Sequence, residues 1–426
     1  MYKDSKDLLT KEIPLVFSQN KKGTIFPRGY INNVRWWGNI PRRELHSLLP
    51  DGTAKLLTMD VDIGDTCSLN CPHCFRRDPR FDIIKANALT HEEIVSYIKD
   101  AKKLGLRRIK ILGRGEPFEN PRFLEFLIKM TELNIGVSVF TKGHVLGCDE
   151  LTRKYNYEKY GIKTGLELVQ KLRGLKVSIL LGFNSFNKKI QEQFTGVDKY
   201  PAASLLKDYV RFRDRALIYL VEAGFNKHEE GKATRLAMIA APIKPEILNE
   251  ILDLYTWARP RNIYMLSCPT TVSGKGIDEL KREKKFINYT SHLEELYVKI
   301  YIWAITTNLI PLNKFKQDKV SLYPGCHVCN QTAAGFFLNL SGQVNQCPGR
   351  VDETTIFTKD IRKEKNLKYV WTHCLNYKRA KNTHKFNYYC AARDGRSLPV
   401  DFYDHIYAKV LQHFAETTGP ITTNPC

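Results

Sequence analysis

The sequence predicts an α/β protein: an open, partial (βα)6 TIM-like barrel with an N-terminal extension and a small Cys-rich C-terminal α+β domain. Two observations predict the barrel. Short apolar runs alternate six times with segments whose apolar residues have helical spacing, and this alternation is typical of parallel βαβ units. Six units are too few to close an eight-stranded barrel. A third observation predicts the C-terminal domain, because cysteines become frequent beyond residue 320.

The elements of the barrel can be placed along the chain. The six expected strands are 56–63, 108–112, 135–141, 176–182, 235–241 and 262–267. The expected helices are 91–105, 121–133, 165–173, 202–223 and 245–257. The first helix has the clearest bounds, since Thr90 and Glu93 have capping-box spacing and Gly105 is a helix terminator. Ligands of such sheets bind at the carboxyl ends of the strands.

The remaining segments give a division into four parts. We expect an N-terminal extension over 1–55, the barrel core over 56–276, a helical linker over 277–319 and a cysteine-bearing domain over 320–426. The linker begins with the charged run IDELKREKK and continues to a helix near 292–306. In the last part, GFFLNLSGQVNQCPG predicts a hairpin with Gly342 at the turn, where a tight turn needs a positive φ.

The composition favours a globular protein with anionic partners. Of the 426 residues, 43% are hydrophobic and 26% are charged, and the formal net charge is +21. Such a charge suits nucleic acid, an acidic peptide or a phosphorylated small molecule, and it also fits a solvated basic surface. We find no run of 18 apolar residues and no apolar signal-peptide core. We therefore expect no membrane span and a cytoplasmic location.

Three cysteines follow the first expected strand in DTCSLNCPHCFRR. Cys67, Cys71 and Cys74 have the spacing C-x3-C-x2-C, and three thiolates on one loop can face a single centre. Thiolates select zinc, copper or iron–sulfur clusters. Structural zinc prefers four protein ligands, whereas three thiolates leave one iron of a [4Fe-4S] cube free for an external ligand. A zinc knuckle is the alternative.

This loop, placed after the first of six βα units, resembles the radical S-adenosylmethionine (SAM) superfamily over about residues 56–276. GRGEP at 113–117 resembles the family's GGEP motif, which hydrogen-bonds the SAM amino group, and Thr141-Lys142-Gly143 resembles its T-N-G. The resemblance implies SAM contacts by Gly113, Gly115 and Glu116, by Asn184 and Ser185 at the ribose, by Arg235 at the carboxylate, and by His73 and the backbone around Phe75. Ordinary turns and a surface ion pair are the alternatives for Asn184, Ser185 and Arg235.

The resemblance also implies a mechanism. The open iron would bind the amino and carboxylate groups of SAM. One-electron reduction would then cleave SAM to methionine and a 5′-deoxyadenosyl radical, which abstracts a hydrogen atom from a substrate C–H bond. An electron donor such as flavodoxin or ferredoxin is expected. The cofactor carries this chemistry, and the protein positions the substrate.

A second group of cysteines lies near the C-terminus. Cys326 and Cys329 form C-x2-C, and Cys329, Gly342 and Cys347 have the spacing C-x12-G-x4-C. This pattern resembles the twitch element, which is also the first half of the SPASM domain, and implies a second, auxiliary [4Fe-4S] cluster. The expected ligands are Cys326, Cys329, Cys347 and either Cys390 or Cys374, with Cys390 preferred. A structural zinc site with the same ligands is the alternative.

One isolated cysteine gives a catalytic hypothesis. Cys268 follows the sixth strand, where active-site groups gather, and it is a candidate hydrogen donor for a radical epimerisation or else a buried structural residue. Cys148 and Cys426 read as small hydrophobic residues.

Relatives with twitch or SPASM elements indicate oxidative modification (dehydrogenation or crosslinking) or epimerisation of a peptide or protein. The alternatives are modification of tRNA or of a sugar or aminocyclitol. From another class, the chain would be a non-catalytic, metal-stabilised nucleic-acid-binding protein.

Overall fold

The computed structural model describes residues 5–20, 23–37, 40–77, 87–277, 286–350, 353–382, 390 and 392–417. Its main feature is a nine-stranded sheet with the order β11-β10-β9-β3-β4-β5-β6-β7-β8. The six strands expected from the sequence are β3 (Thr58–Val61), β4 (Arg108–Ile111), β5 (Gly136–Thr141), β6 (Val177–Gly182), β7 (Leu236–Ala240) and β8 (Tyr264–Ser267). They pair in parallel and in chain order. The sheet is not closed, which confirms the expected partial barrel.

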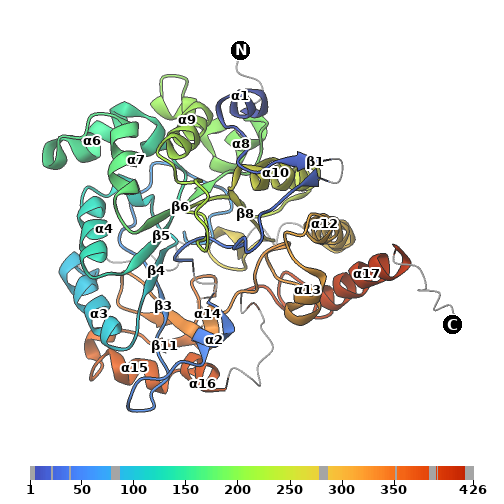
Figure 1. Ribbon diagram of the computed structural model, residues 1–426. Coiled ribbons are helices and arrows are strands. Elements are labelled where there is room, and N and C mark those ends of the chain that lie inside the picture. The colour runs from blue at the N-terminus through green and yellow to red at the C-terminus, as the bar shows by residue number, and fades with distance from the viewer. Residues whose placement is uncertain are drawn as a thin grey trace.

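Helices cover the outer side of this sheet (Figure 1). They are α3 (His91–Lys103), α4 (Phe123–Glu132), α7 (Gly165–Arg173), α9 (Tyr209–Glu222) and α10 (Leu248–Ala258). The capping box of α3 is present, and its apolar face is buried. The predicted helix 202–223 starts later, because a 3-10 turn over Leu205–Asp208 precedes α9.

Within the described part of the barrel core, three helices were not predicted from the sequence. They are α5 (His144–Gly147), α6 (Asp149–Tyr160) and α8 (Lys188–Thr195). The buried residues of α6 are Thr152 and Asn156, both polar, so its sequence carries no apolar periodicity that would mark a helix.

The N-terminal segment closes the amino ends of the strands. It contains α1 (Ser5–Glu12), β1 (Gln19–Asn20), β2 (Gly23–Thr24) and α2 (Arg42–Leu45). The carbonyl of Arg35 accepts hydrogen bonds from the hydroxyls of Ser178 on β6, at 2.6 Å, and Ser138 on β5, at 3.4 Å. The Trp36 ring lies directly against Gly136, where a Cβ atom would lie 2.0 Å from it. The extension is therefore part of the barrel's packing.

The C-terminal residues extend the barrel sheet. The predicted hairpin is present as β9 (Gly335–Leu338) and β10 (Val344–Asn345), which pair antiparallel, and Gly342 has a φ of +84°. β9 also pairs in parallel with β3, which the sequence did not predict, and β11 (Ile356–Thr358) completes the edge.

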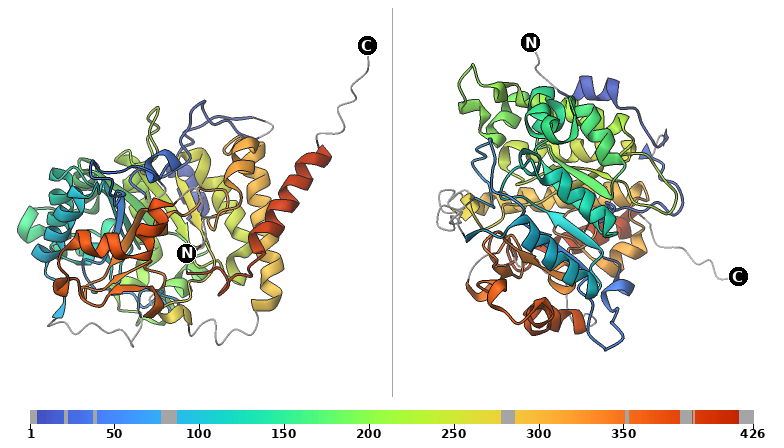
Figure 2. Two further views of the ribbon diagram at one scale, coloured as in Figure 1. Left: turned by 90° about the horizontal axis from the view of Figure 1, so that it is seen from below. Right: turned by 90° about the vertical axis from the view of Figure 1, so that its left-hand side faces the viewer.

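The remaining C-terminal elements are helices. They are α12 (Phe286–Thr306), α13 (Leu312–Asp318), α14 (Gln331–Ala334), α15 (Leu367–His373), α16 (Leu375–Lys381) and α17 (Phe402–Thr417). Figure 2 shows α17 beside α12 at one flank, where the rings of Tyr297 and Phe402 meet at 5.2 Å. The expected helix near 292–306 falls within α12, and most of the charged run IDELKREKK lies outside the described residues. Among the described helices, none is long and apolar enough to cross a bilayer.

Candidate active site between two groups of cysteines

A cavity of about 240 Å³ lies at the carboxyl ends of the barrel strands. The loop after β3 lines it with Cys67, Cys71 and Cys74. Cysteines from three other segments also line it, namely Cys268, Cys329 and Cys347. The structure thus brings residues from both cysteine groups to one space, as expected for a site at this end of a parallel sheet.

A buried polar network holds the first cysteine loop. The Glu119 carboxylate accepts hydrogen bonds from the Ser68 amide at 2.9 and 3.0 Å, the Ser68 hydroxyl at 2.6 Å, and His144 Nε2 at 2.7 Å. Burial raises the pKa of Glu119, but the hydrogen bonds from His144 and Ser68 outweigh it, and the net pKa is lowered. Arg77 closes the loop by donating to the carbonyls of Leu69 and Cys67.

The GRGEP segment packs on the same loop. The Glu116 amide donates to the Thr66 carbonyl at 2.8 Å, and a Cβ atom on Gly115 would lie 2.3 Å from that oxygen. The Glu116 carboxylate accepts hydrogen bonds from Thr141 Oγ1 at 2.5 Å and from the Lys142 amide at 2.8 Å. Gly113, Gly115 and Glu116 all line the cavity. Glu116 therefore ties this segment to the end of β5.

His73 and Phe75 also line the cavity. His73 is buried, its ring lies 4.9 Å from that of Phe194, and neither ring nitrogen has a hydrogen-bond partner among the described residues. Burial lowers the pKa of His73 well below its usual value, so the ring is neutral. The Phe75 carbonyl accepts a hydrogen bond from the Ser273 hydroxyl at 3.0 Å, and Gly274 packs on the Cys74–Phe75 backbone. Unpartnered polar atoms facing a cavity fit a site for a bound group.

Asn184 and Ser185, which the sequence predicts at the SAM ribose, lie away from the cavity. Asn184 Nδ2 donates to the Ala241 carbonyl at 3.1 Å, and the Ser185 hydroxyl donates to Glu250 at 2.5 Å. Both residues are buried, and neither is among the described residues that line the cavity. Their contacts are those of turn residues that fix the end of β6.

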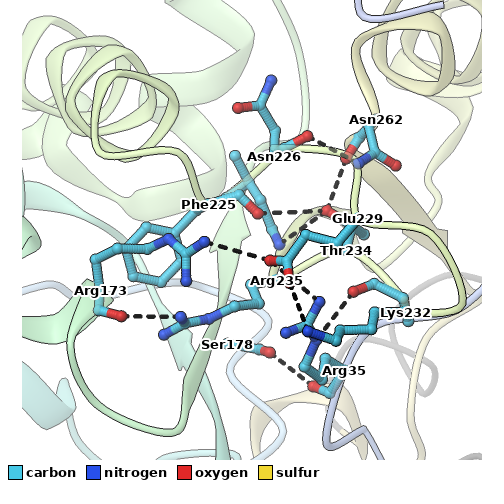
Figure 3. Close-up of polar contacts among 12 residues, drawn as sticks. Arg35, Arg173, Ser178, Phe225, Asn226, Glu229, Lys232, Thr234, Arg235 and Asn262 are labelled. Carbon is cyan, nitrogen blue, oxygen red and sulfur yellow. Dashed lines mark hydrogen bonds and ion pairs between the residues drawn. The ribbon is translucent and has the colours of Figure 1, made fainter.

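Arg235 lies at the amino end of a barrel strand, away from the cavity, and Figure 3 shows it beside Arg173. It comes just before β7, and its guanidinium donates to the carbonyls at the end of α7 and the start of β6, those of Leu172, Arg173, Leu175 and Val177. The expected pairing with the SAM carboxylate does not fit this position, because ligands of a parallel sheet bind at the carboxyl ends of the strands. Arg235 instead joins α7 to β6 and β7.

Two buried ion pairs line the cavity and were not predicted as site residues. Arg76 contacts Asp62 at 2.5 Å and donates to the Pro348 carbonyl at 3.0 Å, and Lys110 contacts Asp60 at 3.0 Å. Asp60, Arg76 and Lys110 are cavity-lining residues. The sequence did carry a signal, since charged side chains interrupt the apolar runs of the first two strands.

The second cysteine group is divided. Cys329 and Cys347 line the cavity, and Cys390 lies beside Arg393, which lines it too. Cys326 and Cys374 are buried elsewhere, where their thiols donate to the carbonyls of Met265 and Trp371 at 3.0 and 3.1 Å. Within the described residues, no three His, Cys, Asp or Glu side chains form a group that could hold a single metal ion.

Comparisons with known proteins agree with this site. Residues 61–239 match the family model for the Radical SAM superfamily. A "Probable GTP 3′,8-cyclase" of Thermococcus kodakarensis is 28% identical over 138 residues, which are 32% of this chain and 38% of that protein. A GTP 3′,8-cyclase of a Sulfurovum species is 24% identical over 310 residues, 68% of this chain and 81% of that protein.

A solved structure shares the fold. The structure described as native anSMEcpe with bound AdoMet superposes with a TM-score of 0.52 at 13% identity, and the match covers 85% of this chain and 97% of that one. The family match covers the Cys67–Cys74 loop and the GRGEP segment, which the structure places on one cavity. The non-catalytic alternative is thereby set aside: residues 61–239 form a radical SAM domain, the domain of S-adenosylmethionine-dependent enzymes.

Proposed function

We propose that this protein reductively cleaves SAM and uses the resulting 5′-deoxyadenosyl radical to abstract a hydrogen atom from a substrate C–H bond. One observation carries the proposal. A single cavity is lined both by Cys67, Cys71 and Cys74 and by Cys268, Cys329 and Cys347 from distant segments. A substrate between them would lie near both the source of the radical and a second redox centre.

The first cysteine loop fits a [4Fe-4S] cluster. Cys67, Cys71 and Cys74 would hold it, and when bound it would supply the electron that cleaves SAM. Glu119 fixes the loop through Ser68, and Glu116 fixes the GRGEP segment beside it. Gly115 allows the GRGEP segment to pack directly on the loop backbone, because a Cβ atom there would lie 2.3 Å from the Thr66 carbonyl oxygen. His73 offers a neutral ring whose nitrogens have no hydrogen-bond partner among the residues that the structure describes.

The second cysteine group fits an auxiliary [4Fe-4S] cluster. Its thiols would hold a group able to accept an electron from the substrate radical, which suits a net oxidation such as dehydrogenation or crosslinking. The Arg393 guanidinium lies beside the thiols of Cys390, which belongs to this group, and of Cys268. Hydrogen bonds and charge near the sulfur atoms tune the potential of such clusters.

We propose a peptide or protein as the substrate, on the strength of the +21 charge, which suits an acidic chain. A second candidate is a guanine nucleotide. Two relatives are named GTP 3′,8-cyclase, and basic side chains line the cavity, where a phosphate could contact them: Arg76, Arg77, Lys110, Arg114 and Lys142. A flavodoxin or ferredoxin would supply the electron in either case.

The experiment that tests SAM cleavage uses the anaerobically reconstituted full chain, reduced with dithionite. We expect 5′-deoxyadenosine from SAM and an EPR signal that SAM perturbs. The Cys71→Ala variant is the control, because it lacks one ligand of the first cluster and should lose both. A reduced, iron-loaded chain that forms no 5′-deoxyadenosine contradicts the proposal.

The substrate class can be assigned from isotope transfer. Hydrogen abstraction moves substrate deuterium into 5′-deoxyadenosine, so the reaction is run with deuterated GTP and, separately, with a peptide digest from cells grown in deuterated medium. Deuterium from the peptide digest supports the peptide proposal. Deuterium from GTP overturns it in favour of the nucleotide.

A further inference from the structure

We infer that the auxiliary cluster is held by Cys268, Cys329, Cys347 and Cys390, and that Cys326 is not a ligand. The inference rests on the proposed function, in that it assumes an auxiliary cluster, and it changes the ligand set expected from sequence spacing. It is carried by the direction in which each thiol points and by a buried arginine between two of them.

Cys326 is held away from the cavity by a tight turn. The turn runs from Tyr323 to Cys326, with Pro324 and Gly325 at its centre, and Gly325 has a φ of +68°. Pro followed by a glycine of positive φ is typical of a type II turn, and the Cys326 amide closes it by donating to the Tyr323 carbonyl at 3.0 Å.

The thiol of Cys326 points into the core behind β8. It donates to the Met265 carbonyl at 3.0 Å and lies 3.9 Å from Tyr255 Oη. Cys326 is not among the described residues that line the cavity. The C-x2-C spacing therefore puts its two thiols in different environments, because Cys329 does line the cavity.

Cys268 replaces Cys326 at the cavity. It is the residue after β8, and it lines the cavity together with Leu266 on the same strand face. Arg393 Nη2 donates to Cys268 Sγ at 3.1 Å, while Nη1 of the same guanidinium donates to Cys390 Sγ at 3.6 Å. One planar side chain thus joins the thiols of two segments that are far apart in the sequence.

Cys347 is brought to the same place by the turn after β10. Its Sγ accepts a hydrogen bond from the Gly349 amide at 3.4 Å. A Cβ atom on Gly349 would lie 2.9 Å from both Thr271 Cγ2 and Ala392 Cβ, so the three loops that carry Cys268, Cys347 and Cys390 meet at this glycine. Amide donors to sulfur are a regular feature of cluster ligands.

Arg393 needs negative charge beside it. Its side chain is buried, and no carboxylate lies within ion-pair distance of it in the described part of the chain. The neighbouring Asp394 interacts with it electrostatically, but the Asp394 carboxylate accepts hydrogen bonds from the Cys390 amide and the Tyr403 hydroxyl. The hydrogen bonds of Arg393 go to the two thiols, the Thr271 hydroxyl and the Pro269 carbonyl. A buried cation that forms no direct ion pair is costly. Thiolates that ligate a cluster would supply that charge, since ligation removes the thiol protons.

The test compares two cysteines that are matched in burial, at 5% exposed for Cys268 and 7% for Cys326. Each is changed to Ala in the full chain, which is reconstituted anaerobically with iron and sulfide. The readouts are iron and zinc content per chain and the EPR of the reduced protein with and without SAM. We expect about eight irons in the unaltered chain and in Cys326→Ala, and about four in Cys268→Ala.

The SAM-perturbed EPR signal of the first cluster, retained in Cys268→Ala, shows that the variant is folded. The opposite pattern, with iron lost from Cys326→Ala and kept in Cys268→Ala, overturns the inference, and so does zinc in place of iron. A third outcome is possible: the iron content falls in Cys268→Ala, but the unaltered chain does not cleave SAM. That result supports the ligand set and contradicts the proposed function.

Discussion

Single atoms decide whether the first cysteine loop can form. Gly115→Ala would place a Cβ atom 2.3 Å from the Thr66 carbonyl oxygen and 2.9 Å from the Asp65 carbonyl carbon, both of them backbone atoms. We expect this substitution to displace the loop and lower the iron content by about four per chain, one cluster. Gly174→Ala is the control, because its nearest neighbour would be 3.4 Å away. Equal iron in the two variants would contradict this reading.

Glu119 gives the same loop a pH dependence. Its pKa is lowered from 4.5 by the hydrogen bonds of His144 and Ser68, despite burial. A lowered carboxyl pKa stabilises the folded state above the unfolded value of 4.5, and this contribution is lost as the pH falls through the folded pKa. Glu119→Gln should cost about 2 kcal/mol of unfolding free energy at pH 7.

The measurement is urea unfolding from pH 7 to pH 3. The difference between Glu119→Gln and the unaltered chain should shrink towards the acid end, because only the unaltered chain loses the Glu119 charge. A difference that stays constant over this range would mean that the carboxylate charge does not hold the loop. The exposed pair Glu92–Arg122 offers Glu92→Gln as the comparison.

The spacing of residues in the sequence indicates which side chains belong to the candidate site, but it does not indicate the direction in which each side chain points. Cys67, Cys71 and Cys74 follow the end of a strand, and the carboxyl ends of parallel strands meet at one edge of the sheet, so the sequence predicts their place at the cavity. Arg235 is predicted as a SAM contact because it lies on the fifth strand. It stands at the amino end of that strand, whereas ligands of a parallel sheet bind at the carboxyl ends. Cys326 was assigned by C-x2-C spacing, but the Pro324–Gly325 turn sets its direction, and spacing does not encode that. Glu119 and His144 meet only through the fold.

At the scale of elements, the N-terminal segment is held by its backbone. The Arg35 carbonyl accepts a hydrogen bond of 2.6 Å from the Ser178 hydroxyl at the amino end of β6. Ser178→Ala should lower the unfolding free energy by about 1 kcal/mol, since a buried acceptor loses its best donor. Denaturant midpoints measure this, with the exposed Ser96→Ala as control. A loss no larger than that of the control would mean that the segment is held by packing alone.

Elements with a repeating pattern were predictable, and those without one were not. The six parallel strands are apolar runs, and α7 has the bounds predicted for it, Gly165–Arg173. By contrast, α6 buries only polar residues. The pairing of β9 with β3 joins residues far apart in the chain, at Thr58 and Gly335 for example, and local sequence says nothing about such a partner.

For the whole molecule, the charge of +21 acts at a distance. Two of the cavity cations, Arg76 and Lys110, are paired with Asp62 and Asp60, so most of the long-range field comes from the other basic side chains. Surface charges are screened over about 10 Å at 0.1 M salt. With an anionic substrate, raising the salt from about 0.05 to 0.5 M should lower kcat/KM about tenfold and leave kcat unchanged, because steering affects association. Substrate-independent SAM cleavage is the control, and a kcat/KM that ignores salt contradicts the prediction.

Cluster removal tests whether the two cysteine groups hold the molecule together. The auxiliary ligands come from the end of β8, the segment before α14, the end of β10 and the segment before α17, so one bound group would cross-link four distant parts of the chain. A group that binds only the folded state adds its binding energy to folding. Stripping iron with a chelator should lower the thermal midpoint by about 5 °C or more. Cys326→Ala should show the same fall, whereas Cys268→Ala, which lacks the cross-link, should show a smaller one. If iron removal lowers the thermal midpoint equally in the two variants, then only the first cluster stabilises the fold.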